Sequence, residues 1–320
     1  FIVLTFSDRN AHFRKIDTEI SAKHGIRMCS SDTIGPGGIF RAMREIPHVL
    51  DMARDARRLA PQAWLINFVN PTTVLGMALR RYAPEMASFA ICDGHHEPHF
   101  SLCYCKRAGI LPEDAKVIPP SVQRRLDLAV SGVNHFTWFT KAQYRNINLF
   151  EVYRQFADKY YETGYGAGAA GGQGNNPFHS GARVRFDLFL RFGYIAAAGD
   201  RHLAEFMDKD DYLASPEAVD KWMFKLTPVF WRRADRERRI AKSKRLLSGE
   251  EKFVLHSSGE EGVLQMRALL GLGTLVTNVN LPNAGQIPNL PLGTIVETNA
   301  AFKADMLSPV QSGNIPGSIY

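Results

Sequence analysis

The sequence predicts an α/β fold, in which a doubly wound parallel sheet is followed by a second, α+β domain. Three observations support this fold class. Apolar runs alternate with helix-like segments over the first third of the chain, as in repeated strand–helix–strand units. These runs are largely continuous, which is typical of parallel strands that are covered on both faces. Beyond residue 120 the pattern changes, so we expect two domains, at residues 1–120 and 121–320.

Three strands and two helices are expected in the first domain. The strands are the mainly apolar runs FIVLTF (1–6), WLINFVNP (64–71) and FAIC (89–92). Residues 32–61 form the first helix, and residues 72–82 form a second helix that we expect two threonines to cap. The apolar positions of the first helix repeat at helical spacing: Ile39, Met43, Ile46, Val49, Leu50 and Ala53.

The second domain is expected to begin with a pair of strands. Residues 126–144 are predicted to bend at 132–134, with His135 directly after the turn. Residues 182–246 have mainly helical patterns, and residues 274–300 return to strands and turns. Mixed order of this kind predicts a domain of separate helices and strands packed on the parallel sheet.

The charge balance favours a small anionic substrate over nucleic acid. The 320 residues include 39 Lys and Arg against 32 Asp and Glu, which gives a net charge of +7. The basic residues are spread out, and their densest run, 231–245, alternates bases with acids as on an exposed helix. The glycine-rich run 164–176 lacks the G-x-G-x-x-G order and a preceding strand, so we interpret it as a surface loop rather than a nucleotide site.

The cysteines and the apolar runs indicate where the protein is found. Cys29, Cys92, Cys103 and Cys105 have the spacing of neither a disulfide framework nor a zinc knuckle, which favours the reducing cytoplasm. No apolar run approaches the roughly 20 residues of a membrane span. The first residues already resemble a buried strand and no Met precedes them, so we expect a fragment of a longer chain.

Polar side chains follow the three predicted strands of the first domain. Asp8, Asn70 and the pair Cys92–Asp93 come directly after them. Ligands of an open parallel sheet bind at the carboxyl ends of its strands, so we expect these residues to line one crevice. Two alternatives remain open. Asn70 can simply form the turn before Pro71, and Cys92 can be a small buried apolar residue.

A divalent metal in this crevice would take a mixture of sulfur, nitrogen and oxygen ligands. Cys92 can supply a thiolate, and His135 is its best partner because a tight turn fixes the direction of the side chain. His95 and His99 have helical i, i+4 spacing, but Pro98 lies between them. The histidines that follow Cys92 therefore remain weaker candidates for the ion than His135.

Six segments occur in the order seen in one enzyme family. They are DTIGPGGIFRAMREIP, AWLINFVNPTTVLGMAL, ICD, SGVNHFTW, RFDLFLRFGY and NVNLPNAGQIPNLP. Together they resemble glycoside hydrolase family 4, the NAD- and manganese-dependent glycosidases, over nearly the whole chain. The resemblance implies a Rossmann-like domain that lacks its first strands and glycine-rich turn, followed by a domain like the C-terminal domain of lactate and malate dehydrogenases. The chain as given should therefore bind NAD poorly.

The resemblance also implies a redox route to glycoside hydrolysis. Hydride moves from C3 of the sugar to NAD⁺, a base removes the C2 proton, the C1 group leaves, and water adds before C3 is reduced again. A divalent cation such as Mn²⁺ acts as a Lewis acid on the developing negative charge. The run FGYIAAAGDRHLAEF resembles the α-galactosidase and α-galacturonidase branch, so an α-galactoside or α-uronide substrate is expected, with homodimers or homotetramers.

Residue roles at the metal and cofactor are also implied by the resemblance. Cys92 and His135 match the metal-binding cysteine and histidine of the family. Asn70 matches an asparagine near the substrate hydroxyls, and we expect Asn70 and Asp8 to contact the cofactor.

The remaining implied roles concern the reacting sugar. Asp93 matches a residue proposed to assist departure of the leaving group, and Tyr194 is the candidate C2 base. On a helix, Asp187 would share one face with Tyr194 and could tune its phenol, although Tyr194 can equally be the end of an amphipathic helix. His95 and Arg183 are candidate contacts for a sugar carboxylate.

Two alternative functions remain open. A lactate/malate-type dehydrogenase shares the sheet, the Asn-Pro pair after a strand and a histidine in a hairpin, but it needs no metal, and Cys92 argues against it. The other alternative is an inactive fragment whose nucleotide site is missing. Metal removal would separate the two enzymes, and NAD binding by the fragment and by the complete chain would test the second alternative.

Overall fold

The structure is a computed structural model that describes residues 1–7, 9–30, 32–92, 104–115, 118–123, 125–166, 177–255 and 261–320. The strands are β1 (Ile2–Leu4), β2 (Leu65–Asn67), β3 (Ser88–Ala90), β4 (Leu126–Val133), β5 (Phe136–Tyr144), β6 (Ile147–Asn148), β7 (Ile195–Ala196), β8 (Leu275–Pro282), β9 (Ile295–Lys303) and β10 (Met306–Pro309). The helices are α1 (Asn10–Lys23), α2 (Gly35–Leu59), α3 (Thr72–Tyr82), α5 (Pro120–Gln123), α6 (Leu149–Tyr160), α7 (Arg183–Phe192), α8 (Asp200–Phe206), α9 (Lys209–Tyr212), α10 (Pro216–Lys221), α11 (Val229–Ser248) and α12 (Gly262–Leu269).

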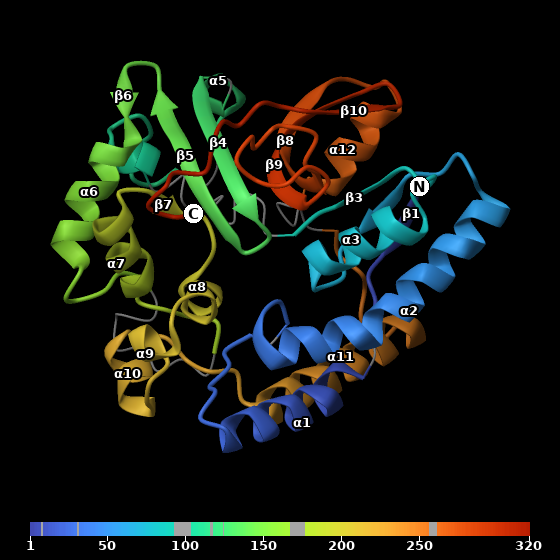
Figure 1. Ribbon diagram of the computed structural model, residues 1–320, viewed down its shortest axis with the longest axis horizontal. Coiled ribbons are helices and arrows are strands. Elements are labelled where there is room, and N and C mark those ends of the chain that lie inside the picture. The colour runs from blue at the N-terminus through green and yellow to red at the C-terminus, as the bar shows by residue number, and fades with distance from the viewer. Residues whose placement is uncertain are drawn as a thin grey trace.

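The described strands form one mixed sheet in the order β1-β2-β3-β8-β9-β4-β5-β6, with β10 beside β9 and β7 beside β5. Figure 1 follows this sheet from β6 on the left to β1 on the right. The first three strands are parallel, as predicted, and the others are antiparallel to their neighbours. The α/β fold class is therefore confirmed.

Strand β2 is covered on both faces because neighbouring side chains of a strand point in opposite directions. Leu65 packs with Val49 of α2 and Leu75 of α3, while Ile66 packs on the other face with residues of α12. We expected both faces of β1 to be covered as well, and this expectation is wrong. Its Val3 is 44% exposed, since the helices that bury the neighbouring Leu4 lie on the opposite face.

The helix predicted at residues 32–61 is confirmed as α2, although α1, which was not predicted, comes before it. The apolar spacing of α2 misplaces the buried face of its first turns. Ile39 and Met43 are 62% and 64% exposed, whereas Val49 and Ala53 are fully buried. The first turns instead approach the preceding loop through small residues. A Cβ on Gly38 would lie 2.6 Å from the carbonyl of Thr33, so a larger residue does not fit there.

The parallel and antiparallel parts of the sheet are joined at β3. Ala90 of β3 pairs with Asn280 of β8, and the rings of Phe89 and Phe302 pack edge to face, with centroids 5.4 Å apart. Residues from both sides of position 120 thus share one core. The division into domains at 1–120 and 121–320 remains a prediction.

Strand β5 separates two hydrophobic cores in the second half of the chain. Trp138 points into one of them, where it meets Leu188 of α7 and Leu203 of α8. The next residue, Phe139, points to the opposite face and packs with Phe186. The predicted helical region 182–246 is confirmed by α7 to α11, and residues 274–300 form β8 and most of β9 as expected.

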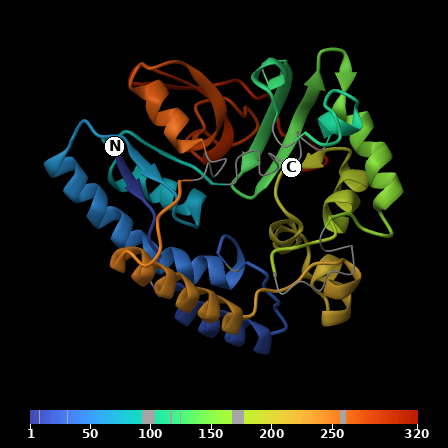
Figure 2. The ribbon, with the colours of Figure 1, turned by 180° about the vertical axis from the view of Figure 1, so that it is seen from behind.

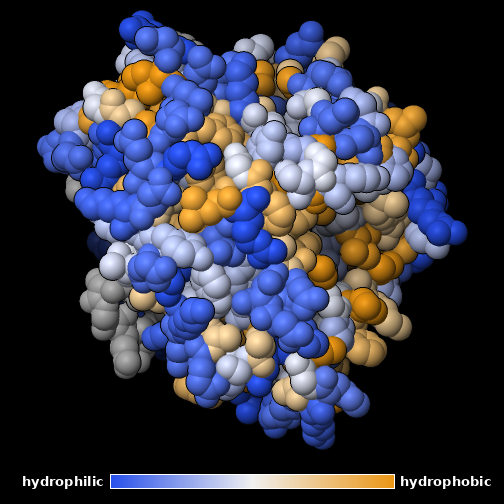
Figure 3. Space-filling view, turned by 60° about the vertical axis from the view of Figure 1, so that its left-hand side comes forward, coloured by the Kyte–Doolittle hydropathy of each residue, from blue (hydrophilic) through white to orange (hydrophobic). Residues whose placement is uncertain are grey.

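Helix α1 packs against both α2 and α11, and the three helices lie together along one side of the molecule in both ribbon views (Figures 1 and 2). The face drawn in Figure 3 is mostly hydrophilic, with hydrophobic side chains in separate groups. Within the described part of the chain, no helix combines the length and the apolar character that crossing a membrane requires.

Candidate active site

Cys92 and His135 meet at the junction of the two halves of the sheet. The Cys92 Sγ lies 3.1 Å from the His135 Nε2. Cys92 follows β3, whereas His135 belongs to the two-residue turn between β4 and β5. Two chain segments that are 43 residues apart therefore present a thiol and an imidazole to each other, as expected if both contact one ion.

The β4–β5 hairpin fixes the direction of His135. Val133 pairs with Phe136, so the turn consists of residues 134 and 135. The sequence predicted His135 directly after the turn, but His135 lies within it and has a φ of +64°. Gly132 is required just before the turn, because a Cβ at this position would lie 2.2 Å from the carbonyl oxygen of Phe136.

The ring of His135 is held by two further side chains. Its Nδ1 lies 2.9 Å from the Thr33 Oγ1, in the loop before α2. Its face stacks on the ring of His202 from α8, with centroids 3.9 Å apart and planes at 15°. When Nδ1–H donates to Thr33, the Nε2 lone pair points toward Cys92. Sequence reasoning missed both residues, although each lies in a segment that resembles the family.

Asn70 lies beside Cys92, as the strand-end pattern predicted. Its Oδ1 is 3.9 Å from the Cys92 Sγ and accepts a hydrogen bond of 2.8 Å from the Thr72 hydroxyl. The expected threonine cap of α3 is wrong for this reason. Thr72 is the first residue of α3, and its hydroxyl binds the side chain of Asn70 instead of a free backbone N–H group of the helix.

The Cys92–His135 pair fits two ligands of one divalent cation. Sulfur and nitrogen atoms about 2.3 and 2.1 Å from an ion lie about 3.1 Å apart at the right angle of octahedral coordination and about 3.6 Å apart at the tetrahedral angle. The observed separation is 3.1 Å. Among the described residues, no group of three or more His, Cys, Asp and Glu side chains is placed to hold a metal. With these two ligands alone, coordination positions would be left for substrate and water.

Asp32 brings negative charge close to this pair. Burial acts to raise the pKa of Asp32, but the positive charges of Arg14 and Arg41, and those of His202 and His135, outweigh burial and hold the pKa at about 2. The Asp32 Oδ2 lies 3.2 Å from Arg14 and 2.8 Å from Arg41. Asp32 is therefore ionised at neutral pH.

The surroundings of Asp32 remain cationic. Burial lowers the pKa of Arg232 to about 10, helped by the positive charge of Arg14. Three buried guanidinium nitrogens in the described part of the chain have no hydrogen-bond partner: Nη1 of Arg14, Nε of Arg41 and Nε of Arg232. Buried donors of this kind favour an anionic ligand nearby. The sequence gives only a weak signal for Arg14 and Arg232, because they belong to helices that are far apart in the chain, α1 and α11.

Tyr194 is placed differently from the expected helix face. It lies beyond the end of α7, where its side chain packs against the Trp138 core. Asp187 instead accepts hydrogen bonds from the hydroxyls of Tyr161 and Tyr212 at 2.9 and 2.5 Å. The expected tuning of Tyr194 by Asp187 is therefore wrong, and the role of Tyr194 as a base stays a prediction.

Arg183 is held by protein oxygen atoms. Its three nitrogens bind the carbonyls of Tyr161 and Lys221 at 2.6 Å and the carboxylate of Glu162 at 3.0 Å. These contacts join α7 to the ends of α6 and α10, and a contact between Arg183 and substrate stays a prediction. Four residues of the expected site and its surroundings lie outside the described residues: Asp8, Asp93, His95 and His99.

Two parts of the chain match descriptions of one family. Residues 1–99 match Family 4 glycosyl hydrolase, and residues 130–320 match Family 4 glycosyl hydrolase C-terminal domain. An α-galacturonidase of Thermoanaerobacterium saccharolyticum is 46% identical over 100% of this chain and 67% of its own length. An α-galacturonidase of Bacillus subtilis is 40% identical over 95% of this chain and 66% of its own length.

Solved structures have the same fold. The crystal structure of a Bacillus subtilis protein named as a glucosidase has a TM-score of 0.86 and 38% identity, and the match covers 99% of this chain and 70% of the other. A 6-phospho-α-glucosidase from gut microorganisms, solved with NAD and Mn²⁺, has a TM-score of 0.72 and 20% identity over 100% and 68% of the two chains. The chain, which spans about two thirds of the length of these relatives, belongs to glycoside hydrolase family 4.

Proposed function

We propose that this chain is the larger part of an α-galacturonidase that uses NAD and a divalent cation such as Mn²⁺. The observation that carries this proposal is the 3.1 Å approach of the Cys92 thiol to the His135 imidazole in a family 4 chain. The substrate class is supported by four relatives named α-galacturonidase, which are 40–46% identical to this chain. An α-galactosidase of Bacillus subtilis is 25% identical, so a uronide is favoured over a neutral galactoside.

Cys92 and His135 would hold the cation, and Thr33 would fix the tautomer of His135 by accepting its Nδ1 proton. When bound, Mn²⁺ polarises the hydroxyl oxygens of the sugar, and NAD exchanges hydride with its C3. Asn70, whose amide lies beside the thiol, is positioned to hydrogen-bond a sugar hydroxyl.

Proton transfer is assigned to two residues whose roles follow from the family resemblance. Tyr194 would remove the proton at C2, which becomes acidic once C3 is a ketone, and Asp93 would assist departure of the C1 group. Water then adds at C1, and the ketone is reduced in the reverse of the first step. The net reaction is hydrolysis, with no change in the oxidation state of the sugar.

The charge around Asp32 supports an acidic substrate. Arg14 and Arg41 bind Asp32, and Arg232 is close enough for the charge of Arg14 to lower its pKa. Positive groups in a partly buried site attract a carboxylate more strongly than the same groups in water. The proposed substrate carries such a carboxylate at C6.

We also propose that the enzyme is a cytoplasmic homodimer or homotetramer. An oligomer is supported by large apolar side chains on the exposed face of α2: Ile39, Phe40 and Met43 are 62%, 49% and 64% exposed. A reducing compartment is supported by the free thiols of Cys29, Cys92 and Cys105 among the described residues.

The test is a substrate screen with a chain extended to the length of its relatives. We expect turnover of nitrophenyl α-galacturonide that requires both NAD⁺ and Mn²⁺ and is abolished by EDTA. Turnover of a 2-hydroxy acid that survives EDTA would instead establish the lactate/malate-type dehydrogenase. NAD binding by the 320-residue chain and by the extended chain tests whether the shorter one is an inactive fragment.

A further inference from the structure

A row of buried residues crosses the sheet next to the Cys92–His135 pair. The row runs over five neighbouring strands, and each of its residues is paired with the next. Its members are Asn67 of β2, Ala90 of β3, Asn280 of β8, Glu297 of β9 and Gly132 of β4. Paired residues of a sheet point to the same face, so the two amides and the carboxyl group lie on one side of it. The carboxyl group of Glu297 is 1% exposed, and a carboxyl group buried to this extent needs polar partners.

The row lies close to both candidate ligands. Cys92 is two residues beyond Ala90 in the chain, and Asn134 is two residues beyond Gly132 and directly before His135. Two residues span at most roughly 7 Å. A side chain of the row can therefore contact the segments that carry the thiol and the imidazole.

The turn that carries His135 does not have the conformation that a hairpin favours. Two-residue turns that match the twist of their strands have a positive φ at their first residue. In the β4–β5 turn φ is positive at the second residue, His135, but not at the first, Asn134. A positive φ costs free energy in residues that have a Cβ atom, so contacts from outside the hairpin are needed to hold this turn.

Glu297 supplies a contact of this kind. Its Oε2 accepts a hydrogen bond of 3.0 Å from the Asn134 Nδ2, and both side chains are 1% exposed. The two residues are 163 positions apart, so β9 restrains the turn from outside the hairpin. Thr33 and His202 hold the ring of His135, whereas Glu297 holds the residue before it. The ring and the main chain of the candidate ligand are thus restrained by different parts of the fold.

We infer that Glu297 is a positioning residue, which acts through Asn134 to hold the β4–β5 turn so that the His135 Nε2 faces Cys92. The inference rests on the proposed function, because its effect is to prepare two ligands for the cation. Ligands that are already in place lose less freedom when the ion binds, which raises the affinity. An apolar side chain would fill the same buried position at a lower cost of desolvation, so an acid at this position favours a role in direction over a role in packing.

Two variants of Glu297 separate its hydrogen bond from its volume and its charge, in a chain extended to the length of its relatives. Glu297→Met keeps most of the volume but removes the acceptor, and we expect Mn²⁺ affinity, measured by calorimetry, to fall about tenfold. Glu297→Gln keeps an oxygen that can accept from Asn134, and it should change the affinity less than about threefold. A loss in Glu297→Gln as large as that in Glu297→Met would overturn the positioning role.

Asn134→Ala tests whether the effect passes through Asn134. It removes the donor and leaves β9 unchanged, so it tests the inference even if Glu297→Met does not fold. We expect Mn²⁺ affinity to fall about tenfold. Because Asn134→Ala and Glu297→Met break the same hydrogen bond, the double variant should also lose about tenfold. A loss of about a hundredfold would overturn the route through Asn134.

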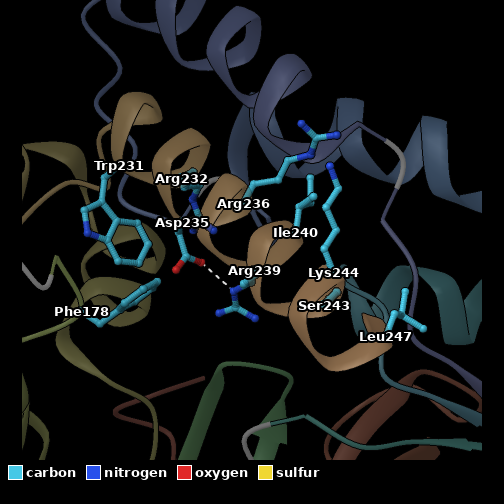
Figure 4. A pocket seen from close by; sticks show the side chains of 10 residues that line it. All are labelled: Phe178, Trp231, Arg232, Asp235, Arg236, Arg239, Ile240, Ser243, Lys244 and Leu247. Atoms are coloured by element: carbon cyan, nitrogen blue, oxygen red, sulfur yellow. Dashed lines mark hydrogen bonds and ion pairs between the residues drawn. The ribbon is translucent and has the colours of Figure 1, made fainter. Parts of the chain in front are cut away.

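Two controls address general effects on stability and charge. Thr298→Ala changes the next residue of β9, which is fully buried and points to the opposite face, so it should lower stability in urea and leave Mn²⁺ affinity unchanged. Asp235→Asn removes an acid of α11 that accepts a hydrogen bond of 2.7 Å from Arg239, beside a cavity lined mainly by that helix (Figure 4). It should also leave the affinity unchanged. A tenfold loss in either control would overturn the specific role of Glu297.

Turnover of nitrophenyl α-galacturonide distinguishes this inference from the proposed function. A wild-type enzyme that cleaves the uronide, but whose Mn²⁺ affinity is the same in Glu297→Met, would overturn the positioning role alone. A wild-type enzyme whose Mn²⁺ binding depends on Glu297 and Asn134, but which cleaves no uronide, would overturn the proposed function and keep the positioning role.

Discussion

The imidazole rings of His135 and His202 lie nearly parallel, with their centroids 3.9 Å apart and their planes at 15°. One ring comes from the β4–β5 turn and the other from α8, so the stack joins the sheet to the helices beside it. Thr33 binds the edge of the same His135 ring at Nδ1. With its face and one nitrogen both occupied, His135 presents its Nε2 toward Cys92 in a fixed direction.

Replacing Cys92 by Ser should abolish Mn²⁺ binding and Mn²⁺-dependent turnover. The hydroxyl of Ser is a far weaker acid than a thiol and stays protonated, so one of the two candidate ligands is lost. The partly buried position should tolerate the smaller atom, and we expect the melting temperature to change by less than about 3 °C. Manganese titration and calorimetry check both outcomes, and a serine variant with unchanged turnover would exclude Cys92 from the site.

Replacing Thr33 by Val should weaken metal binding about tenfold without unfolding the protein, because it removes the partner of His135 Nδ1 while keeping the side-chain volume. Thr33→Ser keeps the hydroxyl and serves as the matched control. Titration of both variants with Mn²⁺ measures the effect. Equal affinities would mean that the 2.9 Å contact does not orient the ring.

Replacing His202 by Ala should destabilise the fold by about 1 kcal/mol beyond the loss of buried area, because the stacked ring is removed. His202→Phe keeps an aromatic face against His135 and should retain most of the stability. Urea unfolding of both variants compares them directly. A phenylalanine variant as unstable as the alanine variant would show that stacking is not the stabilising contact.

Asp32 should make stability dependent on pH below about 4. Its pKa falls from 3.8 to about 2 in the folded chain, so the folded state favours the ionised form. The resulting stabilisation, roughly 2 kcal/mol, is present above the unfolded pKa and is lost as the pH falls through the folded pKa. The difference in unfolding free energy between wild type and Asp32→Asn should shrink between pH 5 and pH 2.

The control for Asp32 is Asp51→Asn, which removes an exposed carboxylate whose 2.8 Å pair with Arg54 lies on the surface of α2. Exposed pairs contribute about 0–1 kcal/mol, so this variant should follow the wild type across the pH range. Curves for Asp32→Asn that run parallel to the wild type would contradict the low pKa.

The proposed elimination route predicts exchange at the carbon next to the oxidised centre. Hydrolysis of nitrophenyl α-galacturonide in D₂O should place deuterium at C2 of the released galacturonate, because a base removes that proton and solvent returns another. Mass spectrometry and proton NMR of the product measure this. A product without deuterium at C2 would point to direct displacement by water at C1.

Much of the fold and the centre of the site could be predicted from the sequence. The continuous apolar runs identified the parallel strands, and the residues that follow them identified Asn70 and Cys92 as neighbours. The G-V-N-H-F turn identified His135 as their partner. Local sequence was sufficient because a strand end and a tight turn each fix the direction of a side chain within a few residues.

The remaining contacts were decided by tertiary structure. Thr33 and His202 contact His135, and Asp32 interacts with its charge, from a loop and a helix that are distant in sequence. Nothing in their local patterns indicates which neighbours they face. Periodicity likewise could not show that Ile39 stays exposed while α2 approaches its loop through Gly38. Spacing along the chain determines which residues share a face of an element, whereas only packing between elements determines what that face meets.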